Sequence, residues 1–376
     1  MRGGTSKGLL VHEKHLPADR RKWDALFLAA LGSPDPYGRQ LDGMGGGLSS
    51  LSKVCVIGAP TRGDADVDYT FGQVLIKEAR VDWMPLCGNM SSAVGPYAVD
   101  EGLVNARGDT AEVRIHNTNT KKIIVALFPL EDGYASVDGN LTIPGIPGTG
   151  APVRLDFLDP GGATTGQLLP TGNVVDTLNV PGFGAFEVSM VDASNACVFL
   201  RAADIGLTGT ELPAEIEANA AATQVLSAIR LAASVRMGIA SNEREAMKKT
   251  AVPFIGFVAP SARAATISGE IIDPGRVDLV ARVISNGQPH RALPLGVSVC
   301  LGVASKIAGS IVHAAATEHA GPDKLLVSMP SGILQVTAEV SNHDGIWHAV
   351  RGGFYRTQRR LFQGHVLVRA SALDLS

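Results

Sequence analysis

The chain has 376 residues, of which 45% are hydrophobic and 18% are charged, and its formal net charge is −3. This composition excludes a disordered or fibrous protein, and a length above the roughly 250–300 residues at which a single core stops growing predicts two domains. Because lysine and arginine form no extended cluster, a nucleic-acid-binding surface is not expected, and any anionic partner should be small.

The cysteine and histidine patterns argue against disulfides and metal sites. The nine histidines form no HExxH motif, and the cysteines are far apart and form no C-x-x-C pair, so no metal is expected. The four cysteines are Cys55, Cys87, Cys197 and Cys300. No signal peptide or membrane span is recognisable, and the simplest location for the chain is a reducing cytoplasm.

The first half of the chain is predicted to place strands around one buried helix. Apolar residues at helical spacing predict an amphipathic helix over 19–31, and a short apolar helix is predicted over 88–101. The strands predicted from alternating or β-branched runs are 52–58, 67–83, 111–117, 121–128 and 152–158.

The second half repeats this order of elements without repeating the sequence. A long helix is predicted over 214–238 and a second buried helix over 294–309. The predicted strands are 186–193, 196–202, 252–259, 277–284, 332–341, 346–355 and 364–370. Because the turn-forming segment LLPTGN precedes the boundary, we place the first domain at 1–177 and the second at 178–360. A C-terminal strand within 361–376 is expected to complete the first domain.

Four short segments combine glycine with polar side chains, and they are 2–8, 42–53, 87–92 and 171–173. None is a nucleotide motif, because GGTSKG reverses the order of a P-loop and GMGGGL lacks the last glycine of GxGxxG. Backbone N–H groups in such segments, beside hydroxyls and a cation, suit a carboxylate. For any one segment alone, a tight turn is the simpler interpretation. His290 and Arg291, just before the second buried helix, either bind an anion or form a surface pair.

Cys87 and Lys53 are the side chains best suited to proton transfer. Cys87 precedes Gly-Asn at the expected start of a helix, where unpaired N–H groups would stabilise a thiolate and lower its pKa from about 8.5. The alternative is a small buried apolar residue, which is our interpretation of the other three cysteines. Lys53 begins an apolar strand after a glycine- and serine-rich loop, where it is either a solvated edge residue or a desolvated base.

Several segments, taken in order, resemble one protein family. They are MRGGTSKG, GSPDPYGRQLDGMGG, SSLSKV, DVDY, CGNMSSAVGPYA, LLPTGN, RMG, VPFIGFVAP and MPSG. Together they make nearly the whole chain similar to the PrpF family of cofactor-independent isomerases, typified by 2-methylaconitate cis-trans isomerase. The family also includes 4-oxalomesaconate tautomerase and methylitaconate Δ-isomerase.

The resemblance implies an α+β fold like that of diaminopimelate epimerase. Two similar domains would each wrap a curved, mostly antiparallel sheet or barrel around a central helix, with the active site in the cleft between the domains. It also implies that no metal or organic cofactor is required, that the substrate is a small polycarboxylate, and that the chain forms a homodimer.

The resemblance further implies that Lys53 and Cys87 form the acid/base pair. Bound carboxylates would be held by loops that also stabilise the negative charge of a dienolate intermediate. The residues expected to bind substrate are Arg2, Thr5, Ser6, Lys7, Ser49, Ser50, Gly88, Asn89, Thr171, Asn173, His290, Arg291, Ser331 and Gly332.

The expected reaction is a shift of a double bond, or of its cis-trans geometry, in an acid like 2-methylaconitate or aconitate. The alternatives are a 4-oxalomesaconate tautomerase, a methylitaconate-type Δ-isomerase and, in a different class, a polycarboxylate-binding protein without chemistry. The chain departs from the family at Arg291, where relatives often have a histidine, and at MPSG in place of HPSG. The segment 292–296 has no cysteine, which disfavours an amino-acid racemase.

Overall fold

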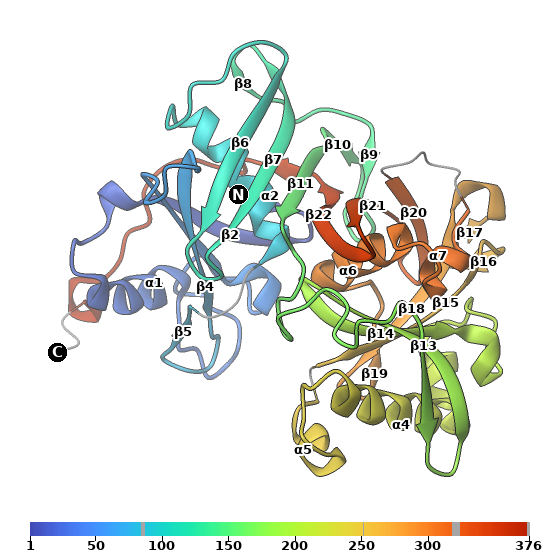
Figure 1. Cartoon of the computed structure of the whole chain (residues 1–376). Coiled ribbons are helices and arrows are strands. Elements are labelled where there is room, and N and C mark those ends of the chain that lie inside the picture. Colours follow the sequence, from blue (N-terminus) through green and yellow to red (C-terminus); the bar gives the residue numbers. More distant parts are fainter. Residues whose placement is uncertain (84–86, 251, 318–323, 374–376) are drawn as a thin grey trace. The chain divides into compact units, whose positions relative to one another are not determined.

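Both ends of the chain belong to the same unit of the structure. The structure, a computed structural model, describes residues 1–83, 87–250, 252–317 and 324–373. Its contacts divide the chain into a first unit, Met1–Leu155 with Tyr355–Ser376, and a second unit, Asp156–Phe354 (Figure 1). The predicted domain boundary at 177/178 therefore falls inside the second unit.

The described residues of the first unit form a mixed sheet and two α-helices. Its strands are β1 (Arg2–Gly3), β2 (Ser6–His12), β3 (Lys53–Gly58), β4 (Val67–Val74), β5 (Val81–Asp82), β6 (Thr110–Asn117), β7 (Lys122–Glu131), β8 (Tyr134–Ala135), β9 (Leu141–Thr142), β10 (Thr149–Gly150) and β23 (Gln358–Arg359). Its helices are η1 (Glu13–His15), η2 (Arg20–Lys22), α1 (Trp23–Leu31), η3 (Ser49–Leu51), α2 (Gly88–Asp100) and η6 (Ala370–Ala372). Two further strands, β11 (Val153–Leu158) and β22 (Ile346–Arg356), run across the unit boundaries.

The sheet of the first unit alternates between parallel and antiparallel pairs in the order β2-β3-β4-β6-β7. The pairs β2–β3 and β4–β6 are parallel, whereas β3–β4 and β6–β7 are antiparallel. The short strand β1 pairs antiparallel with both β2 and β23. The last strand of this unit is therefore held by the first residues of the chain.

Helix α2 is the buried centre of the first unit, as the sequence predicts. All residues from Met90 to Val99 are buried. The helix approaches the sheet closely because Gly95 has no side chain: a Cβ there would lie 2.9 Å from the Ala126 and Phe128 side chains of β7. Small residues thus allow the helix to pack directly against the strands.

Helix α1 covers a second face of the first unit. Trp23, Phe27 and Leu31 pack in one cluster with Val54 and Val74. The predicted helix over 19–31 is confirmed from residue 23 onward, while its first turn is the 3₁₀-helix η2, which the Asp19 side chain caps.

The second unit repeats the pattern of a sheet around a helix. Its strands are β12 (Asp176–Val180), β13 (Gly184–Ala193), β14 (Asn195–Arg201), β15 (Phe254–Pro260), β16 (Ala264–Ala265), β17 (Ile271–Ile272), β18 (Leu279–Ser285), β19 (Gln288–Pro289), β20 (Lys324–Met329) and β21 (Gly332–His343). Its helices are η4 (Ala202–Ile205), α3 (Pro213–Ala218), α4 (Ala220–Arg236), α5 (Glu243–Lys248), η5 (Pro274–Arg276), α6 (Leu295–Lys306) and α7 (Ile311–Ala315).

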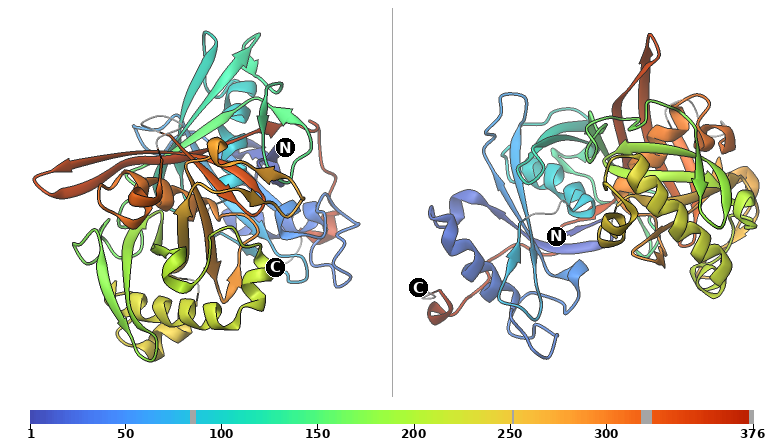
Figure 2. Two further views of the ribbon diagram at one scale, coloured as in Figure 1. Left: turned by 90° about the vertical axis from the view of Figure 1, so that its right-hand side faces the viewer. Right: turned by 60° about the horizontal axis from the view of Figure 1, so that its bottom comes forward.

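Helix α6 is the counterpart of α2, and it packs against β13, β14 and β21. Residues Val297 to Ser305 are buried. On the other side of the strands, Leu226 and Ile229 of α4 join a cluster with Val188 and Val198 of β13 and β14 (Figure 2). The predicted α+β fold, with a central helix in each unit and mostly antiparallel strand pairs, is confirmed.

Three predicted elements are wrong, and one of them is the strand over 67–83, which is divided into β4 (Val67–Val74) and β5 (Val81–Asp82). The helix over 214–238 is interrupted at Asn219, whose backbone is not helical and whose side chain accepts a hydrogen bond from the Ala222 N–H (3.0 Å), so α3 and α4 are separate. The strand over 364–370 does not form: residues 360–369 have no strand or helix structure, and the strand that pairs with β1 is β23 at residues 358 and 359.

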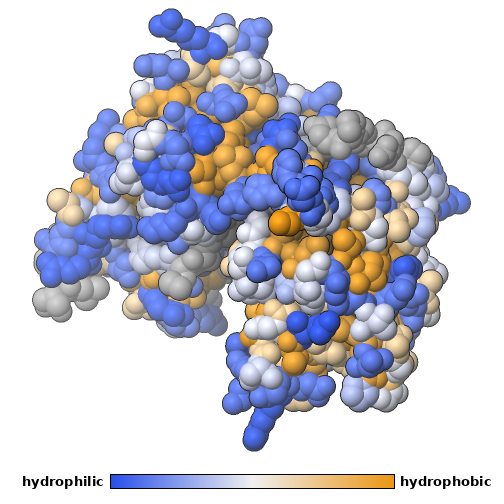
Figure 3. Space-filling model, in the orientation of Figure 1, coloured by the Kyte–Doolittle hydropathy of each residue, from blue (hydrophilic) through white to orange (hydrophobic). Residues whose placement is uncertain are grey.

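The surface seen in Figure 3 is mostly hydrophilic, with apolar areas on both units. Within the described ranges, none of the helices is long and apolar enough to cross a membrane.

Candidate functional site

The start of the chain contacts the start of helix α2. Gly4 has φ +49° and lies so close to the Asn89 amide that a side chain at this position would collide with it. The Asn89 Oδ1 atom accepts hydrogen bonds from the Thr5 N–H (3.4 Å) and from Arg356 Nε (3.1 Å). The structure thus brings Thr5 and Arg356 together at Asn89, close in the chain to Gly88 and Cys87.

Arg356 was not predicted. Its side chain is almost completely buried, and burial lowers the pKa of its guanidinium to about 10. A second hydrogen bond, from its NH1 group to the Tyr355 carbonyl (2.8 Å), fixes the guanidinium beside Asn89. Arg356 lies in the last long strand of the chain, and nothing in the sequence around it indicates that its side chain contacts the N-terminal region.

The predicted residues of the N-terminal segment differ in their surroundings. Arg2 donates hydrogen bonds to the Gly4 carbonyl (2.9 Å) and to the carbonyl and hydroxyl of Thr357 (3.1 and 3.0 Å), so its guanidinium ties β1 to the C-terminal segment. Ser6 is buried, and Lys7 is half-buried opposite Arg2 in the β1–β2 pair. Arg2 therefore has a structural role in this state.

Lys53 is the first residue of β3 and is 8% exposed. Its Nζ donates a hydrogen bond to Gln73 Oε1 (2.6 Å) and lies 5.2 Å from the centre of the Phe71 ring. Gln73 Nε2 in turn donates to the carbonyls of Ser49 (3.0 Å) and Ser52 (2.9 Å). Gln73 thus joins Lys53 to the loop that carries the predicted residues Ser49 and Ser50.

Cys87 is the N-cap residue of α2 and is partly exposed. Its carbonyl accepts hydrogen bonds from the backbone N–H and the hydroxyl of Ser91, both at 3.0 Å. The side chain itself precedes the first turn of the helix, which is the placement that the sequence predicts.

Cys55 connects the surroundings of Lys53 and Cys87. It stands two residues after Lys53, on the same face of β3, and its thiol lies 3.8 Å from the buried Tyr69 hydroxyl. Burial, and then the charge of Cys87, raise the pKa of Cys55 to about 12, while the Met1 amino group and Lys53 act in the opposite direction. Helix α2, which begins after Cys87, packs against β3, the strand that carries both Lys53 and Cys55.

The predicted residues Thr171 and Asn173 bind a carboxylate of their own unit. The Thr171 hydroxyl and Asn173 Nδ2 (2.9 Å) donate to the two oxygens of the buried Asp176 side chain, which also pairs with Arg236 at 3.4 Å. These side chains close the turn before β12.

The predicted residues near α6 form a second group. His290 Nε2 lies 2.7 Å from the Ser285 hydroxyl, and burial lowers the pKa of His290. The Leu293 N–H donates to Met329 Sδ (3.4 Å), which ties the segment after the exposed Arg291 to the hairpin between β20 and β21. The other two predicted residues of the second unit, Ser331 and Gly332, lie at the turn of this hairpin.

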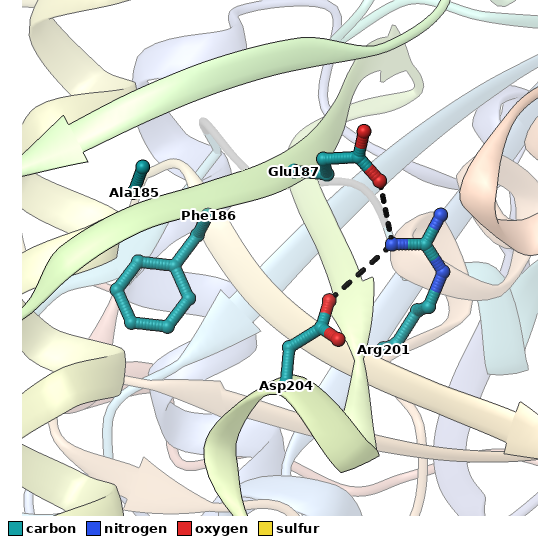
Figure 4. Close-up of a pocket in the computed structure, with 5 residues that line it drawn as sticks. All are labelled: Ala185, Phe186, Glu187, Arg201 and Asp204. Carbon is teal, nitrogen blue, oxygen red and sulfur yellow. Dashed lines mark hydrogen bonds and ion pairs between the residues drawn. The ribbon is translucent and has the colours of Figure 1, made fainter.

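A surface pocket of about 280 Å³ lies in the second unit and contains none of the predicted site residues (Figure 4). Its charged residues satisfy one another, since Arg201 pairs with Glu187 (2.9 Å) and Asp204 (3.4 Å). Its position therefore does not support a role in the predicted chemistry. Among the residues whose placement is described, no group of three or more His, Cys, Asp or Glu side chains could hold a metal ion.

Comparison with known proteins shows similarity over nearly the full length. The protein-family model described as "PrpF protein" matches residues 1–369. The 3-methylitaconate isomerase of Eubacterium barkeri is 41% identical over 375 residues, which cover 99% of this chain and 97% of the relative. The 2-methyl-aconitate isomerase of Shewanella oneidensis is 38% identical over 381 residues, covering 98% of this chain and 95% of the relative.

A solved structure shares the fold. The crystal structure of a methylitaconate-delta-isomerase matches with a TM-score of 0.93 at 41% sequence identity, and the match covers 100% of this chain and 96% of the other. The elements that position Lys53 and Cys87 here thus belong to a fold shared along the whole chain.

Proposed function

Because the chain belongs to the PrpF family and is an isomerase of that family, we propose that it shifts a double bond, or its cis-trans geometry, in an unsaturated di- or tricarboxylate. Lys53 and Cys87 act as the acid/base pair in this proposal. One group removes a proton from a carbon conjugated to a carboxylate, and the electron pair of the broken C–H bond moves into the conjugated system. A proton returned at another carbon completes the isomerisation, so no electrons are gained or lost.

The observation that carries the proposal is that Lys53 and Cys87 share one neighbourhood. Lys53 is the first residue of β3, Cys87 is the N-cap residue of α2, and α2 packs against β3. The intermediate carries extra negative charge on its carboxylate. The backbone N–H groups at the start of α2 and the buried Arg356 guanidinium beside Asn89 are suited to stabilise that charge.

The proposed substrates are acids like 2-methylaconitate and aconitate. The relatives named 2-methyl-aconitate isomerase and 3-methylitaconate isomerase support this class, and a methylitaconate-type or oxalomesaconate-type acid is the alternative. Thr5, Asn89 and the loop with Ser49 and Ser50 are proposed to hold carboxylates in the first unit. The residues His290, Arg291, Ser331 and Gly332 stay predictions for the second.

The first test is proton NMR in D₂O of cis-aconitate, trans-aconitate, 2-methylaconitate and 3-methylitaconate with the wild-type protein. We expect isomerisation or deuterium uptake with at least one acid. In Cys87→Ser and Lys53→Met the rate should fall by about 10²–10⁴-fold, the usual contribution of a positioned acid or base. Lys77→Met, at an exposed position of the same unit, should keep the wild-type rate.

Two outcomes would contradict the proposal. If the folded wild-type protein binds an acid without exchanging any of its carbon-bound protons, the chain is a binding protein rather than an enzyme. If exchange continues at the wild-type rate in both variants, the reaction proceeds without Lys53 and Cys87.

A further inference from the structure

Lys53 is a buried lysine whose side-chain hydrogen-bond acceptor is neutral. Buried ammonium groups are usually paired with carboxylates, because burial without a partner is costly. Over the part of the chain that the structure describes, no carboxylate lies within ion-pair distance of Lys53. The Nζ atom instead contacts the Gln73 amide oxygen and the face of Phe71.

The Gln73 amide can be oriented in only one way. An ammonium group has donors and no acceptor, so it requires the amide oxygen. The backbone carbonyls of Ser49, Ser52 and, at 3.4 Å, Val74 are acceptors and require the amide nitrogen. The Gln73 amide therefore satisfies the ammonium group and these carbonyls together, whereas a carboxylate at this position would face the carbonyl oxygens without a donor.

We propose that Gln73 is a positioning residue that holds the Lys53 amine in place while leaving it able to lose and regain its proton. A glutamate would fix the proton on Lys53 by charge, and an apolar side chain would hold neither the amine nor the loop. A neutral acceptor such as the Gln73 amide holds the amine and the loop without fixing the proton by charge. A group that must carry a proton from one carbon to another requires this combination. This inference rests on the proposed function of Lys53.

Titratable groups lie on several elements around Lys53, and Asp82 of β5 stands opposite Gln73 in the β4–β5 pair. Cys55 lies on the same strand, Cys87 at the start of α2, and the Met1 amino group donates to the carbonyl of Gly8 (2.8 Å), the residue opposite Lys53 in the β2–β3 pair. None of them hydrogen bonds to the Lys53 amine, so a change at Gln73 acts on that amine directly.

The test compares Gln73→Glu, Gln73→Met and the matched control Gln224→Glu, which adds the same charge at an exposed position of α4. Competitive acetylation of Lys53 with acetic anhydride, followed by mass spectrometry, gives the pH at which half of the amine is free. In Gln73→Glu this midpoint should rise by about 1–3 pH units, the effect of an opposite charge in contact. In Gln73→Met it should fall, because the buried ammonium loses its acceptor.

The pH profile of kcat/KM should show the same shifts. The limb that belongs to Lys53 should move up in Gln73→Glu and down in Gln73→Met, while Gln224→Glu should leave both measurements unchanged. An unchanged acetylation midpoint in either folded Gln73 variant would overturn the inference. A Lys53→Met variant with full activity would instead overturn the proposed function, and the acetylation midpoints would still report on Gln73.

Discussion

Cys55 and Cys87 differ in their exposure to solvent. Burial raises the pKa of Cys55 to about 12, so at pH 8 only about one in ten thousand of its thiols is ionised. Cys87 is partly exposed. We expect iodoacetamide at pH 8 to alkylate Cys87 first and to leave Cys55, Cys197 and Cys300 unmodified until the protein unfolds, as peptide mass spectrometry will show. Alkylation of Cys55 in the folded protein at a rate like that of Cys87 would contradict this account.

Single residues of the site were predictable only in part. Lys53 and Cys87 stand next to glycine-rich loops and match a family motif, so the sequence alone points to them. Gln73 gives a weaker signal: at alternate positions after Tyr69 and Phe71, it is a polar side chain on the same face of the strand as these two aromatic residues. Its partners come from a loop whose path depends on tertiary contacts, and the sequence does not reveal such contacts.

Helix α2 tests how closely an element can pack. Gly95→Ala adds a methyl group that would lie 2.9 Å from two side chains of β7, and overpacking of this kind costs about 1–3 kcal/mol. The gain of about 1 kcal/mol in helix propensity should not offset it fully. Urea unfolding followed by tryptophan fluorescence should show a lower midpoint for Gly95→Ala than for the wild type.

Gly63→Ala is the control, because no atom lies within 4 Å of the new Cβ. Its free energy of unfolding should stay within about 0.5 kcal/mol of the wild-type value. Equal stability of the two variants would mean that α2 can move away from the sheet.

Elements with strong periodicity were predicted well, and the exceptions have local causes. The buried helices α2 and α6 follow from runs of small apolar residues bounded by glycine and proline. The strand β2 was missed because its half-buried residues do not alternate clearly. Asparagine favours helix caps over helix interiors, but a single asparagine does not by itself break a helical pattern, and the capping hydrogen bond of Asn219 shows that the helix is broken there.

At the scale of the whole chain, the first unit depends on residues near the C-terminus. A chain that ends at Tyr355 lacks Arg356, Thr357 and β23, and so loses the contacts that hold Arg2, Gly4 and Asn89. We expect hydrogen exchange in residues 2–8 and in the first turn of α2 to rise by at least about tenfold, the factor for 1.4 kcal/mol, with little change in the second unit.

A chain that ends at Gln363 keeps β23 and is the control for this truncation. Its exchange in residues 2–8 should equal that of the full chain. Equal exchange in the shorter truncation as well would show that β1 holds its place without β23.

The pairing of β1 with β23 also sets the order of events during synthesis. Residues 156–354 are synthesised after β1 and before residues 358 and 359. The unit that begins the chain is therefore the last to be completed, which reverses the common order in which the N-terminal domain of a nascent chain folds first. Until then one edge of β1 lacks its partner strand, and an unpaired strand edge is open to pairing with other strands.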